Sequence, residues 1–265
     1  MRLRDKVIVV TGAGGGIGGE LVRELLQRGA RVAAVDMREE SLRALHASVA
    51  NSSKLSTHAL DITNRDSVAS LASLVSDEHG GVDGLINCAG VIQPFVKVQD
   101  VDYEAIERVM NINFYGTLYM TKAFLPTLLG RPEAHIMNVS SMGGFLPVPG
   151  QSVYGASKAA VKLLTEALYA ELIGTSVKVS VVFPGAIQTD ITKNSGVSTP
   201  VSSANSKSYK MLSADAAARI MLDGMERDKV QIYTGSDSKF MRQLYRFAPV
   251  FATRFIAKKM KSLVP

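Results

Sequence analysis

The clearest chemical signal in the sequence is proton transfer by a tyrosine that lies beside a lysine. Tyr154 and Lys158 open a helical pattern over 152–173, and their spacing places both side chains on one helical face. An ammonium near a phenol favours the phenolate and lowers a phenol pKa that is ordinarily about 10. A tyrosine tuned in this way can exchange a proton with a substrate oxygen near neutral pH.

A serine hydroxyl is expected near this pair. The residues Asn138-Val139-Ser140-Ser141 end a predicted strand, so Ser141 comes at a carboxyl end of the sheet. Ligands of open α/β folds bind at such ends. The Tyr-x-x-x-Lys pattern is common by chance, and its meaning here comes from its position after this strand.

A glycine-rich turn predicts a second site, for a dinucleotide. The first predicted strand, Lys6–Thr11, runs into TGAGGGIG and then into a helix, and Gly12, Gly16 and Gly18 are spaced along this turn. Glycine allows positive φ angles and the close approach of a ligand or another backbone. The N–H groups and the dipole at the start of the helix attract a pyrophosphate.

The residue that ends the second strand informs the choice of cofactor. Asp36 follows the predicted strand Arg31–Val35. A carboxylate at this point suits the free 2′-hydroxyl of an adenine ribose and repels a 2′-phosphate. The next residue is Met37, and Arg38 is the one feature that favours NADP. We expect NAD, with NADP as the alternative.

Alternating strands and helices must position these residues. Strands separated by helices need right-handed crossovers, which predict an α/β fold: a Rossmann-type doubly wound parallel sheet of about seven strands, with helices on both faces. We expect one dehydrogenase domain over 1–237. Its further strands are predicted at Leu55–Leu60, Gly84–Asn87, His135–Val139, Lys178–Phe183 and Gln231–Thr234, and its helices at 16–28, 39–50, 65–79, 102–129, 152–173 and 214–227.

In this order and spacing, the motifs resemble the short-chain dehydrogenase/reductase family, in its branch of roughly 250 residues, over about residues 4–236. The resemblance implies that Asp61 contacts the adenine ring and that a segment from Pro184 holds the nicotinamide carboxamide. The second Asn of the family's NNAG element is Cys88 here. The implied cofactor site consists of Gly12, Gly14, Gly15, Gly16, Ile17, Gly18, Asp36, Asp61, Ile62, Asn87, Ala89, Gly90, Tyr154, Lys158, Pro184, Gly185, Ile187 and Thr189.

The same resemblance implies a catalytic set of Asn113, Ser141, Tyr154 and Lys158. Tyr154 would act as general acid/base, Lys158 would lower its pKa and bind the nicotinamide ribose, and Ser141 would orient the substrate oxygen. Asn113 would hold a water that links Lys158 to solvent. The expected reaction is hydride transfer between NAD and a secondary alcohol or ketone. The alternative is a catalytically silent, cofactor-sensing protein, against which the intact set argues.

The substrate is expected to be hydrophobic. The loops after the strands bring mostly apolar residues to the site, with no acidic or basic residue among them. We expect 191–210, which is rich in Ser, Asn and Thr, to form a lid. The candidate lining residues are Gln93, Met142, Phe145 and Gln151, together with Val91, Phe95, Gly143 and Pro147.

Composition narrows the class of protein. The chain has 265 residues and is 46% hydrophobic, which suits a folded globular chain. A single cysteine excludes an intramolecular disulfide framework, and four scattered histidines give no sign of a metal site. No apolar run approaches the ~20 residues of a membrane-spanning helix. We therefore expect a cytoplasmic enzyme with no metal, and a homodimer or homotetramer, as is usual in the family.

The excess positive charge lies in a C-terminal tail, 238–265. The net charge is +6, and this stretch contains no Asp or Glu. Apolar residues recur there at helical spacing and are interrupted by Pro249. We favour packing of this tail on the body or on a second subunit; capping of the substrate site and contact with an anionic membrane stay open. Nucleic acid is not an expected partner. The basic residues are Lys239, Arg242, Arg246, Arg254, Lys258, Lys259 and Lys261, and the apolar ones are Phe240, Leu244, Phe247, Phe251 and Phe255.

Overall fold

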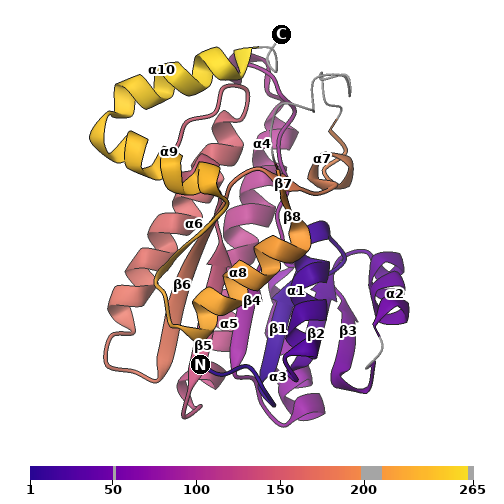
Figure 1. Ribbon diagram of the computed structural model, residues 1–265. Helices are drawn as coiled ribbons and strands as arrows, with labels where there is room; N and C mark the ends of the chain where they lie inside the picture. Colours follow the sequence, from indigo (N-terminus) through magenta and orange to yellow (C-terminus); the bar gives the residue numbers. More distant parts are fainter. Residues whose placement is uncertain (50–51, 198–210, 262–265) are drawn as a thin grey trace.

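A parallel sheet of seven strands forms the centre of the molecule (Figure 1). The computed structural model describes residues 1–49, 52–197 and 211–261. The strand order is β3-β2-β1-β4-β5-β6-β9, and every neighbouring pair is parallel. The predicted Rossmann-type sheet is thereby confirmed. Its strands are β1 (Val7–Thr11), β2 (Arg31–Asp36), β3 (Leu55–Ala59), β4 (Gly84–Asn87), β5 (Ala134–Val139), β6 (Val177–Pro184) and β9 (Gln231–Thr234).

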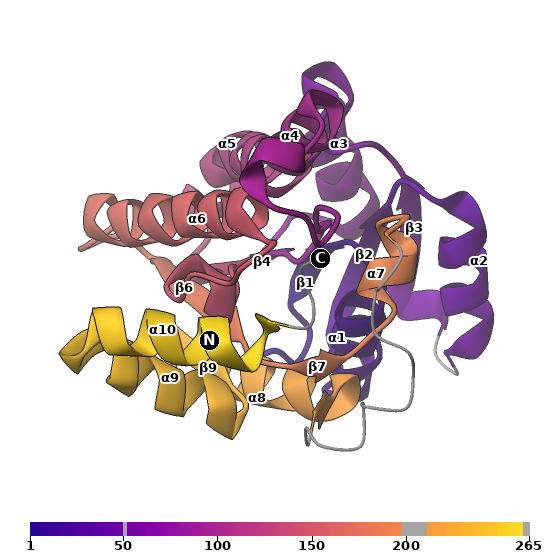
Figure 2. The same cartoon turned by 90° about the horizontal axis from the view of Figure 1, so that it is seen from above.

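The strands are apolar at nearly every position because helices cover both faces of the sheet. Alternate residues of β1 enter two separate cores: Ile8 and Val10 pack with residues of α1 and α8, and Val7 and Val9 pack with residues of α3 and α5. Seen from above, α1 and α8 lie on one side of the sheet and α3, α5 and α6 on the other (Figure 2). The main helices are α1 (Gly16–Gln27), α2 (Glu39–Ser48), α3 (Arg65–His79), α6 (Ser152–Glu171) and α8 (Ala214–Glu226).

The helix predicted over 102–129 is interrupted. It consists of α4 (Tyr103–Met110), a wider π-helical turn (Asn111–Gly116) and α5 (Thr117–Leu129). Extra residues in a helical turn rotate the side chains that follow, and such turns are frequent at functional sites. Asn113 lies in this turn and is fully buried. The local sequence carries no signal for the interruption.

Short elements precede and follow the segment expected as a lid. The strand β7 (Ile187–Gln188) pairs in parallel with β8 (Leu212–Ser213), and α7 (Ile191–Asn194) comes between them in the chain. The pairing fixes the two ends of the segment against the body. The rest of the expected lid, 198–210, lies outside the described residues.

The C-terminal tail forms two helices, α9 (Ser236–Phe247) and α10 (Pro249–Lys259), which begin and end around Pro249 as the sequence suggests. Met241, Ala252 and Ile256 are buried against Leu146 of the body. The residues expected to anchor the tail behave differently. Of these, Leu244 is partly buried, whereas the four phenylalanines are exposed: Phe240, Phe247, Phe251 and Phe255.

The buried face of α9 is not the expected one, because a residue that precedes the first apolar residue of the helix fixes how the helix packs on the body. The hydroxyl of Ser238, which is fully buried, donates to the carbonyl of Phe183 at 2.8 Å. This bond turns Met241, one helical turn later, toward the body and leaves Phe240 outside.

None of the helices in the described parts of the chain is both long enough and apolar enough to cross a bilayer.

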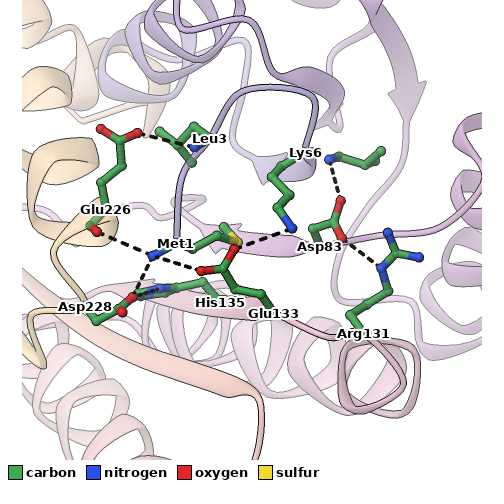
Figure 3. Close-up of polar contacts among 10 residues, drawn as sticks. Met1, Leu3, Lys6, Asp83, Arg131, Glu133, His135, Glu226 and Asp228 are labelled. Carbon is green, nitrogen blue, oxygen red and sulfur yellow. Dashed lines mark hydrogen bonds and ion pairs between the residues drawn. The ribbon is translucent and has the colours of Figure 1, made fainter.

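A polar cluster ties the amino ends of the strands together, opposite the carboxyl ends where ligands of such sheets bind (Figure 3). Its most buried carboxylate is that of Asp83, just before β4. One oxygen accepts the N–H of Val7 at 3.0 Å, and the other accepts Nε of Arg131 at 2.8 Å. Asp83 therefore joins β1 to the segment that leads into β5.

We expect Asp83→Ala to lower the free energy of unfolding by about 2–4 kcal/mol, because a buried N–H and an arginine would lose their partner. Urea unfolding measures this change. As a control, Asp77→Ala on the exposed side of α3 should change stability by less than about 0.5 kcal/mol. Equal effects of the two substitutions would contradict this role of Asp83.

Candidate functional site

A cavity of about 530 Å³ opens at the carboxyl ends of the strands, where the chain order reverses between β1 and β4. The glycine turn forms its floor. Gly12 has a φ of +69°, and a Cβ there would lie 2.8 Å from the Cα of Ala89. A Cβ on Gly18 would collide with the carbonyl of Gly12. These two positions require glycine, as the sequence predicts.

The turn is held against the end of β4 by a residue that the sequence analysis did not single out. Oγ1 of Thr11 accepts the N–H groups of Cys88 at 3.1 Å and of Ala89 at 3.2 Å. It thereby fixes the gap between the two strands that the cavity occupies. Thr11 is the first letter of the glycine motif, which is the signal that could have identified it.

The carboxylate of Asp36 closes one end of the cavity. It accepts the N–H of Gly14 and the N–H of Arg38, each at 3.0 Å, through its two oxygens. Nε of Arg38 lies 3.5 Å from the same carboxylate, and the guanidinium also donates to Oδ1 of Asn194 at 2.9 Å. Asp36 therefore orders the glycine turn, and its position at the end of β2 suits a ribose hydroxyl.

The residues present fit a dinucleotide. The helix α1 begins at Gly16 after Gly15, and no side chain of the N-cap residue caps the N–H groups of its first turn. Of the expected cofactor residues, Gly14 and Asn87 do not line the cavity: Gly14 supports Asp36, and Asn87 donates to Asn138 at 2.8 Å. Those that line it are Gly12, Gly15, Gly16, Ile17, Gly18, Asp36, Asp61, Ile62, Ala89, Gly90, Tyr154, Lys158, Pro184, Gly185, Ile187 and Thr189.

The ammonium of Lys158 is buried in the cavity wall. Its Nζ donates to the carbonyl of Val139 at 3.0 Å, and the side chain is 4% exposed. Burial lowers the pKa of Lys158 to about 8. A Cβ on Gly90 would lie 3.0 Å from this Nζ, so glycine leaves room for the ammonium. Burial raises the pKa of the neighbouring Cys88 thiol to about 12, which keeps the thiol neutral.

Tyr154 and Ser141 reach the same part of the cavity from two elements. Tyr154 comes from the first turn of α6, and Ser141 immediately precedes a short 3₁₀ turn, Met142–Gly144. Burial raises the pKa of the Tyr154 phenol, and its hydrogen bond with the Ser141 hydroxyl opposes this shift. Oγ of Ser141 also accepts the N–H of Gly143 at 3.0 Å. The serine is thus held at the tyrosine.

Asn113 lies behind this group and does not line the cavity. Its side-chain amide donates to the carbonyl of Val91 and to Oγ of Ser157, and its oxygen accepts the N–H of Val91, all at 2.9 Å. Through Asn113, the π-helical turn thus connects the loop after β4 to the second turn of α6.

Gln93 was expected to line the substrate site, and it does not. Its side chain is fully buried, and its Oε1 accepts the N–H groups of Val153 at 2.7 Å and of Tyr154 at 3.0 Å. These are donors at the start of α6, which no residue of that helix can pair. Gln93 therefore caps the helix that carries Tyr154. Because the two segments are far apart in sequence, no local pattern reveals this cap.

The substrate end of the cavity is mostly apolar. Met142 and Gln151 line it as expected, but Phe145 packs against Phe183 and Tyr233 instead. Nε2 of Gln151 donates to the carbonyl of Gln93 at 2.9 Å, whereas its buried Oε1 has no partner in the described parts of the chain. Other lining residues are Val91, Ile92, Phe95, Val148, Ile191 and Met260.

One charged residue of the cavity wall was missed. Arg108 of α4 lines the cavity and donates to the carbonyl of Ser195 at 2.8 Å. Oγ of Ser195 in turn accepts the N–H of Ile92 at 3.0 Å. These bonds hold the residues just after α7 against the body.

No cluster of three or more His, Cys, Asp or Glu side chains that could bind a metal occurs within 1–49, 52–197 and 211–261.

Comparisons with known proteins agree with this geometry. The sequence matches the family described as short chain dehydrogenase over residues 6–198. A Mycobacterium tuberculosis protein, provisionally assigned as the oxidoreductase SadH, is 31% identical over 98% of this chain and 97% of its own. The chain therefore belongs to the short-chain dehydrogenase/reductase family. It is an oxidoreductase of the class that uses NAD or NADP.

Two crystal structures of short-chain dehydrogenases from Burkholderia resemble the fold closely. One, from B. cenocepacia in complex with NADP, has a TM-score of 0.81 and 29% identity, over 97% of this chain and 99% of its own. The other, from B. phymatum in complex with NAD, has a TM-score of 0.80 and 24% identity, over 93% and 96% of the two chains. The two structures contain different cofactors, so they leave the choice between NAD and NADP open.

The cap formed by Gln93 predicts a defined loss of stability. Gln93→Met keeps the volume of the side chain but removes the acceptor of two N–H groups, so the free energy of unfolding should fall by about 1–3 kcal/mol. Gln93→Glu retains two acceptor oxygens and should lose less. Urea unfolding of the three proteins measures both effects. If the Met variant is as stable as the wild type, Gln93 does not hold the start of α6.

Proposed function

We propose that this protein transfers a hydride between NAD and a secondary alcohol or ketone of hydrophobic character. The observation that supports this proposal most strongly is the convergence of Tyr154, Ser141 and Lys158 on the wall of one cavity, which also contains the glycine turn and Asp36. A cofactor held on the glycine turn and a substrate beside Tyr154 would share this single space.

The proton is moved by Tyr154. The nicotinamide cofactor, when bound, supplies or accepts the hydride. In reduction, the Tyr154 hydroxyl donates its proton to the ketone oxygen; in oxidation, the phenolate accepts the proton of the alcohol. Ser141 accepts the N–H of Gly143, so its own hydroxyl hydrogen is free to point at Tyr154 or at the substrate oxygen. A substrate oxygen would lie between the two hydroxyls.

Lys158 supplies the positive charge that the phenolate needs. With a pKa of about 8, its ammonium is largely protonated at neutral pH. A buried cation acts through a low effective dielectric, so it favours the phenolate of Tyr154 more than a solvated lysine would. We assign Asn113 as a positioning residue, because its side chain contacts Val91 and Ser157 rather than the cavity.

The lining supports a substrate that is largely apolar. Val91, Phe95, Val148 and Met142 offer hydrocarbon surface, and burial of such surface stabilises binding by about 25 cal/mol per Å². The loop residues named from the sequence carry no charge, but Arg108 of α4 also lines the cavity, and its bond to Ser195 engages part of its guanidinium.

Asp36 supports NAD as the cofactor. Its carboxylate lies at the ribose end of the cavity and repels a 2′-phosphate. Arg38 would be the phosphate partner in an NADP enzyme, but its guanidinium already contacts Asp36 and Asn194. Binding of NADP would require these contacts to be exchanged. We therefore retain NAD as the preferred cofactor.

We also propose a homo-oligomer that forms through α5 and α6, in a cytoplasmic protein. Bulky apolar side chains lie exposed on or beside these helices, as expected of a surface that a second copy covers. They are Tyr115, Leu129, Leu163, Tyr169 and Ile173.

Substitution of the acid/base tests the proposed reaction. Tyr154→Phe should reduce kcat by about 10²–10⁴-fold and leave NAD binding unchanged, because only the transferable proton is lost. A panel of secondary alcohols and ketones, assayed with NAD and NADP, provides the substrate, and Tyr103→Phe at an exposed position of α4 is the control. Turnover by the Phe variant within a few-fold of wild type contradicts the assignment. Cofactor binding without any turnover across the panel supports the cofactor-sensing alternative.

A second substitution tests the cofactor. Asp36→Ala combined with Met37→Arg removes a repulsive carboxylate and adds a phosphate partner. We expect the ratio of kcat/KM with NADP to kcat/KM with NAD to rise by at least about tenfold. Met37→Arg alone keeps the carboxylate and should shift the ratio less. A wild-type enzyme that already prefers NADP would show that Arg38 outweighs Asp36.

A further inference from the structure

The two tail helices present different faces to the body and to solvent. One face, with Met241, Ala252 and Ile256, is buried on Leu146. The other face, which we call the tail face, carries bulky apolar side chains in solvent. Their exposed fractions are 60% for Phe240, 78% for Phe247, 63% for Val250, 59% for Phe251 and 37% for Phe255. Exposed apolar groups gathered on two neighbouring helices mark an interaction surface.

Cations surround the apolar groups of the tail face. The guanidinium of Arg246 lies 5.7 Å from the ring centre of Phe247, and Nζ of Lys259 lies 5.9 Å from that of Phe255. The rings of Phe251 and Phe255 are stacked at 6.4 Å. The sequence has no acidic residue after Asp237, whose carboxylate accepts the N–H of Ala186. The remaining exposed cations of the tail are Lys239, Arg254, Lys258 and Lys261.

We propose that the tail face binds the surface of a bilayer that contains anionic lipids. Phenylalanines on one face of a short helix insert at the boundary between headgroups and acyl chains, and neighbouring lysines and arginines attract lipid phosphates. Each such cation near an anionic surface strengthens binding by about fivefold. From the sequence, packing of the tail on the body and contact of the tail with a membrane were alternatives. In the structure, one face of the two helices packs on the body and the other face is available for a membrane.

Charge decides against a second tail face as the occupant. Two tail faces in contact would bring two sets of cations together without a carboxylate from either tail, which is repulsive. An anionic lipid surface instead offers negative charge and an apolar interior side by side. Nucleic acid offers the charge alone and would leave the phenylalanines without an apolar environment.

The position of the tail connects this surface with the substrate cavity. Met260, just after α10, lines the cavity, and Met142, another lining residue, packs against the buried face of the tail. Binding of the tail face would therefore hold the cavity wall at the bilayer. If the proposed function is correct, this is where a hydrophobic alcohol or ketone is most concentrated.

A single tryptophan can report insertion directly, because the natural chain has no Trp. Phe251→Trp places the reporter in the tail face, and Tyr103→Trp places it on α4, on the opposite side of the molecule (Figure 2). The full-length proteins are mixed with vesicles of phosphatidylcholine and phosphatidylglycerol, or of phosphatidylcholine alone. We expect a blue shift of the emission only for Phe251→Trp and only with the anionic vesicles.

Sedimentation of the wild type and three variants with the same vesicles tests the contributions separately. Phe247→Ser with Phe251→Ser, and Arg254→Glu with Lys258→Glu, should each weaken binding by at least about tenfold. Tyr103→Ser, which removes an exposed aromatic ring elsewhere, should not weaken it. Raising salt from about 0.1 M to about 0.5 M should weaken binding of the wild type, because the charges are screened.

The proposal would be overturned by no binding to anionic vesicles, by binding without the blue shift, or by a change of oligomeric state in the double serine variant, which would make the tail face a contact between copies. Tighter, salt-sensitive binding to duplex DNA than to the vesicles would likewise overturn it. Neither measurement needs turnover, so a protein that binds vesicles but reduces no ketone would refute the proposed function and leave this inference intact.

Discussion

The candidate site is organised around one buried ammonium, that of Lys158. Taking a cation out of water is costly, and within the described residues no carboxylate forms an ion pair with it. Its Nζ donates to the carbonyl of Val139, and its pKa falls to about 8 as a result of burial. The ammonium is therefore still largely protonated at neutral pH, although it is buried in the wall of the cavity that Tyr154 also lines.

The neighbouring structure accommodates that ammonium. At Gly90 a Cβ would lie 3.0 Å from Nζ, so glycine at this position leaves room for the ammonium. Gly144 lets the loop after β5 pack tightly on the backbone of Lys158. Oγ of Ser140 donates to the carbonyl of Lys158 at 2.7 Å. Gln93 caps the first turn of the same helix. The helix α6 is therefore fixed at Tyr154 and again at Lys158, one turn apart.

Features that depend on local spacing could be predicted from the sequence, and features that depend on distant contacts could not. The apolar strands, the glycine turn with Asp36, and the Tyr154–Lys158 pair each follow from residues close together in the chain. The cap by Gln93 and the place of Arg108 require the fold, since their partners are distant. The buried face of the tail could not be predicted for a related reason. Helical spacing identifies an apolar stripe, but the bond between Ser238 and Phe183 decides which face of the helix is buried.

The most direct test is the ionisation of Lys158 itself, followed by NMR of the protein with ¹³C-labelled lysine side chains and assigned by comparison with Lys158→Arg. The other lysines should titrate near their ordinary value of about 10.4. We expect the signal of Lys158 in the cofactor-free protein to titrate with a pKa of about 8. A Lys158 signal that titrates together with the solvent-exposed lysines would contradict the account, because the ammonium would then be solvated and could not tune Tyr154.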